Sequence, residues 1–228
     1  MINAAVLRIT NNNINLSLEK EGGIKTTKSI GIDDLRKIFN DISFDTDILP
    51  VGTRMYIKNN TKETILLEVP ESIRKVKFGD EHDYDEFNVP TPWTLWELTF
   101  NNHNNIKRLT YSNVYALKHP ILNRKTELFK FPFSNVSSYI CWGDSVIPDR
   151  ENLIGVSSIP DIFYDSYFNY DLDNNYEPIK IHSGIFIDNT FSFFRHFDGE
   201  KTFPYDCLRS VRTLDDLIVK IKERRDDN

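Results

Sequence analysis

The sequence predicts an α+β fold organised around antiparallel strands. Aromatic side chains favour strands, and they make up 13% of the 228 residues. Short runs of alternating apolar and polar residues recur between clusters of Asn, Pro and Gly, which is the pattern of strands joined by turns. Near the C-terminus, apolar residues return at helical spacing instead. A chain of this length can bury a sizeable core.

The N-terminal segment is expected to add strands to this domain. "AAVLRITNNNINLSLEK" gives two alternating runs on either side of a polar turn at residues 11–13. The next stretch, "KTTKSIGIDDLRKIFNDI", predicts a strand that ends near Ile30, followed by a short helix capped by Asp33. We therefore expect a strand-rich elaboration ahead of the main domain.

Two groups of strands are predicted in the central part of the chain. "RMYIKNNTKETILLEVPESIRKVKF" indicates three strands, separated first by Asn59 and Asn60 and then by Pro70. "TLWELTFNNHNNIKRLTYSNVYALK" indicates a hairpin with an Asn-rich turn. Between them, "GDEHDYDEFNVPTPW" is acidic and contains proline, so we expect an exposed loop. A metal site is the alternative, but it needs several oxygens that converge on one point, and a solvated loop is the preferred interpretation.

Two helices are predicted in the C-terminal third. "IPDIFYDSYFNYDLDNN" is expected to form a short helix with Ile162, Phe163 and Tyr167 on about one face, and "IKIHSGIFI" is strand-like. Near the end, Thr213 is the predicted N-cap of a second helix. The basic residues in the last turns of this helix interact favourably with the helix dipole and do not indicate a nucleic-acid-binding patch. The apolar face of this helix comprises Leu214, Leu217, Ile218 and Ile221.

Charge and composition disfavour several classes of function. Acidic residues (34) outnumber basic ones (28), and the net charge of −6 opposes attraction to the phosphate backbone of a nucleic acid. No run approaches the ~18 apolar residues of a membrane span, and the first residues lack the pattern of a secretory signal. The two cysteines are far apart and lack metal-ligand spacing, which predicts reduced thiols in a cytoplasmic protein. We expect no metal or other cofactor.

The segment "FPFSNVSSYICWGDSVIP", residues 131–148, contains a cysteine among aromatic residues. Free cysteines are often buried, and these neighbours favour a structural role for Cys141. Gly143 follows closely and indicates a turn, where glycine allows close approach or a positive φ. Asn135 stands six residues earlier, and its amide is a candidate donor to an oxyanion. Whether Cys141 fills the core or acts as a nucleophile stays open at this point.

No histidine completes a catalytic set in the sequence. A cysteine protease needs a histidine base and an orienting group, and no protease signature surrounds Cys141. Cys207, in "FPYDCLRS", is expected to be buried or half-buried at the start of a helix and carries little functional weight. None of the histidines lies at a spacing that singles it out as a base; they are His82, His103, His119, His182 and His196.

Four segments carry a resemblance to a known family. They are "LPVGTRMYIKNNTKETILLEVPESIRKVKF", "LTYSNVYALK", "TELFKFPFSNVSSYICWGDSVIP" and "FPYDCLRSVRTLDDLI". Together they resemble family D of the prokaryotic relatives of ubiquitin-conjugating enzymes, the branch called PRTRC-system protein B. The family pattern is a strand, a proline–asparagine stretch and a cysteine–glycine loop. It is matched by Tyr115, Ala116, Thr126, Leu128, Pro132, Phe133, Asn135, Val136, Cys141 and Gly143.

The resemblance runs from about Leu49 to Ile218 and implies a ubiquitin-conjugating-enzyme-like (UBC) fold, an antiparallel meander of four strands flanked by helices. On this basis the chain divides into an N-terminal strand-rich extension, 1–48, and a UBC-like domain, 49–228. The family chemistry implies that Cys141 accepts a ubiquitin-like protein as a thioester. The donor is a ThiF-type activating enzyme that uses ATP, and the acyl group then passes to an amine.

The loop around the cysteine departs from the pattern of the eukaryotic enzymes. Their His-Pro-Asn tripeptide is replaced here by Phe-Ser-Asn at residues 133–135. The resemblance assigns Asn135 the catalytic role of steadying the oxyanion, and support of the loop is the alternative. The residues Trp142, Gly143 and Asp144 follow the thiol and are candidate partner-docking residues.

The resemblance also suggests a biological setting, a bacterial mobile-element, plasmid or anti-phage operon with a JAB-type peptidase among its products. Two hypotheses stay open besides the carrier enzyme. A catalytically inactive UBC-fold scaffold is supported by the altered asparagine motif. A phage or plasmid structural protein is suggested only by the Asn-rich and aromatic composition. No interaction with nucleic acid or a membrane is expected.

Overall fold

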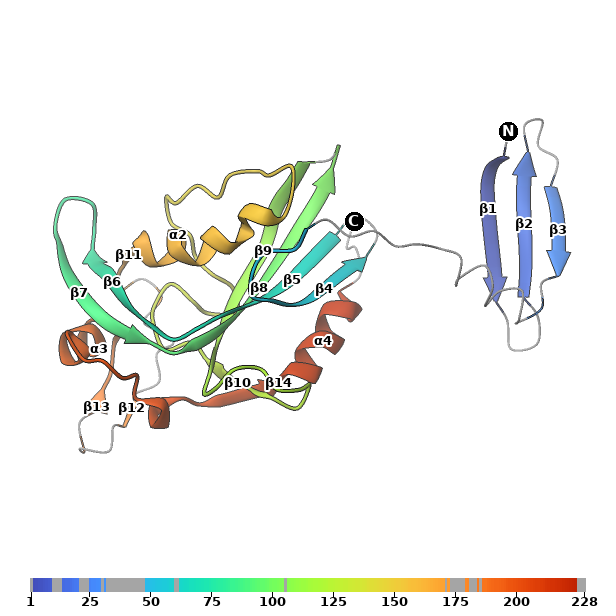
Figure 1. Ribbon diagram of the computed structural model, residues 1–228. Helices are drawn as coiled ribbons and strands as arrows, with labels where there is room; N and C mark the ends of the chain where they lie inside the picture. Colours follow the sequence, from blue (N-terminus) through green and yellow to red (C-terminus); the bar gives the residue numbers. More distant parts are fainter. Residues whose placement is uncertain are drawn as a thin grey trace. The chain divides into compact units, whose positions relative to one another are not determined.

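The computed structural model describes residues 2–9, 14–20, 25–29, 31, 48–59, 62–104, 106–170, 172, 179–180, 184 and 186–224 (Figure 1). The chain forms two compact units, Met1–Thr46 and Asp47–Asn228.

The first unit contains a three-stranded antiparallel sheet in the order β1-β2-β3. Its strands are β1 (Ile2–Ile9), β2 (Ile14–Lys20) and β3 (Lys25–Ser29). These strands confirm the predicted alternating runs and the strand that ends near Ile30. The turn predicted at residues 11–13 and the helix predicted after Asp33 lie outside the described residues.

The second unit is built on a six-stranded sheet whose neighbours are all antiparallel, in the order β14-β10-β9-β8-β5-β4. The strands of this sheet from β4 to β10 lie side by side in the order in which the chain forms them. Strand β14, the last strand of the chain, pairs beside β10. The strands are β4 (Thr53–Asn59), β5 (Lys62–Val69), β8 (Trp93–His103), β9 (Ile106–Leu117), β10 (Glu127–Lys130) and β14 (Ser210–Thr213).

The β5–β8 pair continues past two prolines into a second hairpin, formed by β6 (Ser72–Gly79) and β7 (Tyr84–Thr91). Pro70 and Pro92 lie at the break between the two ladders, because proline has no N–H to donate to a neighbouring strand. Strand β11 (Tyr167–Phe168) pairs in parallel with β6 and extends the smaller sheet to three strands.

The prediction of an exposed loop over the acidic segment was wrong for most of its length. Apart from Pro92, only the turn at residues 80–83 is irregular, and the residues after this turn form β7. Phe87 and Val89 alternate into the core, and Pro90 is tolerated because β7 is an edge strand, which pairs with β6 and with no other described strand. The acidic residues favoured a loop in the sequence analysis, because the core against which Phe87 and Val89 pack is formed by residues far away in the sequence.

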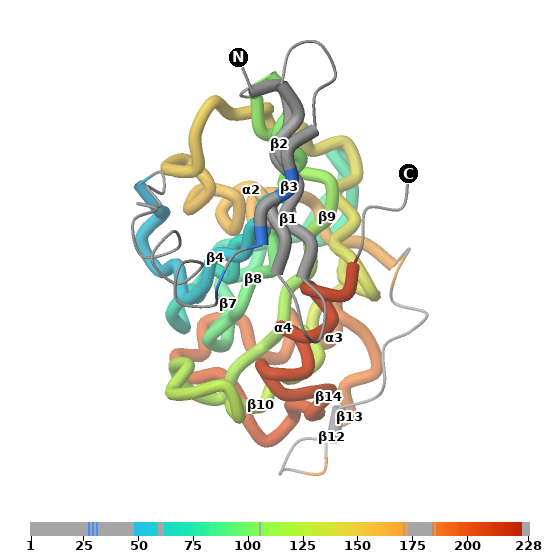
Figure 2. Tube along the Cα trace, turned by 90° about the vertical axis from the view of Figure 1, so that its right-hand side faces the viewer, coloured from blue at the N-terminus to red at the C-terminus, as the bar shows by residue number. Residues whose placement is uncertain are grey.

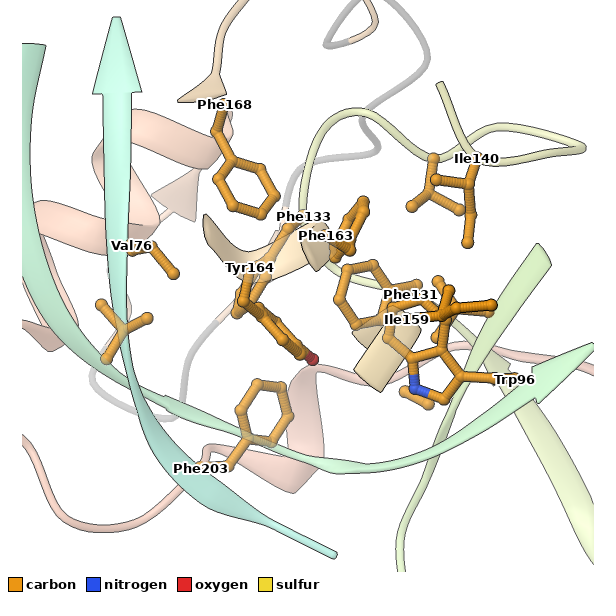
Figure 3. Packing of buried hydrophobic residues seen from close by; sticks show 14 of the residues in the cluster. Val76, Trp96, Phe131, Phe133, Ile140, Ile159, Phe163, Tyr164, Phe168 and Phe203 are labelled. Carbon is orange, nitrogen blue, oxygen red and sulfur yellow. The ribbon is translucent and has the colours of Figure 1, made fainter. Parts of the chain in front are cut away.

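The main core lies between the sheets and the helices α2 (Ile159–Asp165) and α3 (Thr190–Phe197) (Figures 1 and 3). It is aromatic: Trp96 of β8 meets Phe163 of α2 edge to face, with 5.4 Å between ring centroids. Helix α2 confirms the predicted short helix, but it ends at Asp165, so Tyr167 lies in β11 instead. The residues that α2 buries are Ile159, Pro160, Phe163 and Tyr164.

The opposite face of the large sheet is covered by α4 (Leu214–Glu223), and β8 lies between α2 and α4 in both views (Figures 1 and 2). Thr213 caps α4 as predicted: its hydroxyl accepts from the Asp216 N–H, and the Asp216 carboxylate accepts from the Thr213 N–H. The four predicted apolar residues of this helix are all buried, against Leu95 and Leu66 among others.

Replacing Leu217 by alanine is expected to destabilise the protein by about 2–5 kcal/mol, because its side chain is fully buried under the sheet and leaves a cavity. Val219 on the same helix is 48% exposed, and Val219→Ala should change the free energy of unfolding by less than about 0.5 kcal/mol. Urea unfolding of both variants measures the difference. Equal effects would contradict the packing of α4 described above.

Candidate functional site

The cysteine loop, which we define as residues 131–150, follows the free edge of β9. Strand β10 is short and pairs with β9 only at Phe129–Ala116 and Lys130–Tyr115. Beyond this point the returning chain takes over the edge: the Ile140 N–H donates to the Ser112 carbonyl at 3.0 Å. Further along, residues 107 and 150 exchange two backbone hydrogen bonds, of 2.7 and 3.0 Å. Cys141 therefore lies between two points that are fixed to the sheet.

A tight turn places Cys141 at its end. The Cys141 N–H donates to the Asn135 carbonyl at 2.8 Å, and Val136 and Ile140 form an isolated antiparallel bridge. Asn135 has a φ of 63°, a left-handed conformation that asparagine adopts more readily than most residues. Its side-chain amide donates to the Tyr167 carbonyl at 2.9 Å. Asn135 therefore closes the turn through its backbone and joins it to β11 through its side chain.

Trp142 anchors the chain just after the cysteine. Its indole N–H donates to the Ser112 hydroxyl at 3.0 Å, and its ring meets Phe163 edge to face at 6.1 Å. The side chain is half-buried and packs against the main core. The next two residues differ from it: Gly143, with a φ of 53°, and Asp144 are exposed, and no atom lies within 4 Å of a β-carbon built on Gly143.

The thiol of Cys141 belongs to an exposed residue beside an open cavity of about 410 Å³. The five predicted site residues all line this cavity: Cys141, Asn135, Trp142, Gly143 and Asp144. The other walls come from the end of β6 with the β6–β7 turn and from the end of α2 with the segment after it. They contribute Gly79, Asp80, Glu81, Asp165, Ser166 and Tyr167 among others. The fold thus gathers three segments, far apart in the sequence, around one sulfur.

Negative charge dominates the wall of this cavity. Four carboxylates line it, and within the described part of the chain no Lys, Arg or His side chain does. The Asp80 carboxylate accepts hydrogen bonds from the N–H groups of His82 and Asp83, which lower its pKa and keep it ionised. A cationic group is therefore favoured near Cys141 over an anionic one.

Sequence reasoning missed Asp80, Glu81 and Asp165 as site residues. The acidic stretch that contains the first two was visible, but nothing in the sequence connected it to a cysteine about sixty positions further on. The connection depends on the β6–β7 hairpin and on β11, which bring both carboxylate segments to the cysteine loop. Within the described residues, no group of three or more His, Cys, Asp or Glu is arranged to hold a metal ion.

Cys207 has a different environment from Cys141. It is half-buried, which confirms that part of the prediction, but it is the last residue of a short 3-10 helix, η3 (Tyr205–Cys207), and not the start of a helix. Burial raises the pKa of its thiol to about 12. Cys207 is therefore protonated near neutral pH and is a poor nucleophile.

Iodoacetamide is expected to modify Cys141 at least about tenfold faster than Cys207 in the folded protein at pH 8, because only Cys141 is exposed and the Cys207 thiol stays protonated. Mass spectrometry of the two cysteine peptides over time gives both rates. In urea the two rates should converge. Equal rates in the folded protein would contradict the geometry.

Comparisons with known proteins bear on this geometry. The model of prokaryotic E2 family D matches residues 46–211, which include β4 to β10 and the whole cysteine loop. No curated protein and no solved structure matches the chain significantly. Among the described helices, none has the length and apolar character to cross a membrane. Since the family match extends over most of the sequence and confirms the resemblance found there, the chain belongs to prokaryotic E2 family D, a family associated with ubiquitin-like conjugation.

Proposed function

We propose that this chain carries a ubiquitin-like protein as a thioester on Cys141. The donor is a ThiF-type activating enzyme, and the final acceptor is an amine. The observation that supports this most directly is the exposure of Cys141 at an open cavity, in a member of an E2 family. A buried thiol would have left no path for the C-terminal tail of another protein.

The first step of the proposed reaction is transthioesterification. The Cys141 thiolate attacks the carbonyl carbon of the thioester that joins the ubiquitin-like protein to the activating enzyme. A new carbon–sulfur bond forms, the old one breaks, and the thiolate of the activating enzyme leaves and takes a proton from water. Because the incoming thioester is already activated, a thiolate in an accessible position is sufficient, and a full catalytic triad is not required.

In the second step an amine attacks the carbonyl carbon of the thioester on Cys141. The carbon–nitrogen bond forms, the carbon–sulfur bond breaks, and the Cys141 thiolate that leaves takes up the proton released by the nitrogen. The carboxylates of the cavity would attract a lysine side chain as its ammonium ion and orient it toward the sulfur. The ammonium must lose a proton before it attacks, and water in the open cavity can take that proton. The acceptor class supported here is therefore a basic side chain.

Asn135 is proposed to serve both steps. Its amide nitrogen has two hydrogens, and one of them is used by the Tyr167 carbonyl. The second is the candidate donor to the tetrahedral oxyanion, since Asn135 lines the same cavity as Cys141. Gly143 and Asp144, which are exposed, are the better candidates for contact with a partner protein than the inward-facing Trp142.

Reconstitution tests the carrier proposal. Wild type, Cys141→Ala and Cys207→Ala are each mixed with the activating enzyme, ATP and the ubiquitin-like protein that accompany the chain. Wild type and Cys207→Ala are expected to form an adduct that thiol reagents cleave, and Cys141→Ala should form none. The proposal fails if wild type forms no adduct while the activating enzyme charges itself, or if Cys141→Ala still forms one.

The charge of the cavity leads to a separate prediction for the second step. The double variant Asp144→Asn/Asp165→Asn should discharge its thioester to free lysine about threefold to tenfold more slowly, because two attractive charges are lost. Thioester formation should change much less. Glu151→Gln is the control, since Glu151 is exposed but does not line the cavity. Unchanged discharge at low salt would contradict the proposed role of the carboxylates.

A non-catalytic scaffold is the second candidate function. The observation that favours it is the hydrogen bond that the Asn135 side-chain amide donates to the Tyr167 carbonyl. This bond gives Asn135 a structural role that does not require catalysis. The reconstitution separates the two candidates. A scaffold would bind the activating enzyme or the ubiquitin-like protein without forming an adduct on Cys141.

A further inference from the structure

Glu97 is the most unusual side chain on the α4 face of the large sheet. It lies in the middle of β8 and is fully buried. One carboxylate oxygen pairs with the guanidinium of Arg224, and the other has no hydrogen-bond partner among the described residues. A buried carboxylate is costly to desolvate even when it forms an ion pair, and such a pair is often neutral or destabilising compared with apolar residues. General stability therefore gives no reason for its presence here.

Tyr111 connects the Glu97–Arg224 pair to the cysteine loop. Arg224 directly follows α4, where its N–H donates to the Lys220 carbonyl at 3.2 Å. Its guanidinium lies over the ring of Tyr111 in β9, 4.1 Å from the centroid. The Tyr111 hydroxyl in turn donates to the Ser138 carbonyl at 2.9 Å. Glu97, Arg224, Tyr111 and Ser138 thus form an unbroken series of polar contacts.

This side of the cysteine loop has little packing of its own. An open cavity of about 550 Å³ borders it, lined by Tyr111, Ser138, Tyr139, Trp142 and Arg224 among others. Tyr139 is 53% exposed. Because residues 137–139 are exposed, hydrogen bonds contribute more to their position than packing does. The Tyr111 bond is the side-chain contact that crosses to them from β9.

We propose that Arg224, held in place by Glu97, is a positioning residue for Cys141: it fixes the Tyr111 ring, whose hydroxyl fixes the cysteine loop at Ser138. Ser138 is three residues from Cys141 and lies within the turn that the Asn135 carbonyl closes. The end of α4 therefore sets the position of the sulfur without touching it. The consequence for thioester transfer rests on the carrier function proposed above, whereas the effect on the loop does not.

Hydrogen exchange tests the structural part without any partner protein. Tyr111→Phe keeps the ring but removes the hydroxyl, and Arg224→Gln removes the cation over the ring. Each should raise the exchange rates of the Ile140 and Cys141 amides about threefold to tenfold, the effect of losing one hydrogen bond. The double variant should do no more than the larger single change, because both act through one contact. Tyr139→Phe, in the same loop, is the matched control and should leave these rates unchanged.

The pH dependence separates a positioning role from a merely structural one. The charges and titratable groups that face Glu97 are Arg224 and Lys220 near the end of α4, Arg212 of β14, and Tyr111 and Tyr115 of β9. Burial raises the pKa of Glu97 above its ordinary value of 4.5, and the attraction of Arg224 only partly opposes this. Protonation removes the charge that holds Arg224, so protection of the Ile140 and Cys141 amides should fall as the pH decreases through the raised pKa.

Global stability should respond in the opposite direction. A carboxyl group whose pKa is raised by folding contributes most to stability below its unfolded value of 4.5, and this contribution is lost as the pH rises through the folded value. Compared with Glu97→Gln, wild type should therefore gain stability on acidification while its loop loses protection. In Glu97→Gln the protection of the loop should no longer depend on pH in this window.

Reconstitution then measures the catalytic consequence. Tyr111→Phe and Arg224→Gln should lower kcat for thioester formation with little change in KM for the activating enzyme, and Tyr139→Phe should have no effect. Unchanged loop protection in both variants would overturn the positioning role, even if wild type forms the adduct normally. If wild type forms no adduct but loop protection changes as expected, the carrier proposal fails and the positioning of the loop stands.

Discussion

The site depends on the way in which the free edge of β9 is satisfied. A strand edge presents N–H and carbonyl groups that need partners, and β10 is too short to supply them beyond Tyr115. The returning chain fills this role at Ser112 and again at residues 107 and 150. An irregular segment can therefore cross the sheet edge at a fixed position. Cys141 is exposed because it lies between these hydrogen bonds and not within them.

Support for this loop comes from both sides of the sheet. On one side, Trp142 reaches the aromatic core next to α2 through Phe163, so the core that stabilises the fold also holds the residue after the cysteine. On the other side, Tyr111 reaches Ser138 from beneath the end of α4. Trp142 also donates to the Ser112 hydroxyl, so the two supports involve neighbouring residues of β9, Tyr111 and Ser112. Their side chains face opposite sides because consecutive residues of a strand do so. The position of the sulfur thus depends on contacts with β9 as well as on the hydrogen bonds within the loop.

The carboxylates around the cavity concentrate part of the negative charge of this acidic protein beside Cys141. The net charge of −6 already disfavours nucleic acids, and the fold concentrates part of that charge at the thiol. The β6–β7 turn is held over the cavity by the bend at the two prolines and by the pairing of β6 with β11. Family membership indicates ubiquitin-like conjugation in general, and the charge of the cavity supports the basic acceptor proposed above.

The sequence alone determined the local structure. Alternation predicted β4, β5, β6, β8 and β9, and the Thr213 cap and helical spacing predicted α4, because short-range hydrogen bonds and apolar periodicity decide these elements. The order of its motifs also indicated the family and singled out Cys141. Only the tertiary structure decided that β7 is a strand, that Trp142 faces inward and that carboxylates from two distant segments surround the thiol. Each of these depends on contacts between residues far apart in the chain, which no local pattern records.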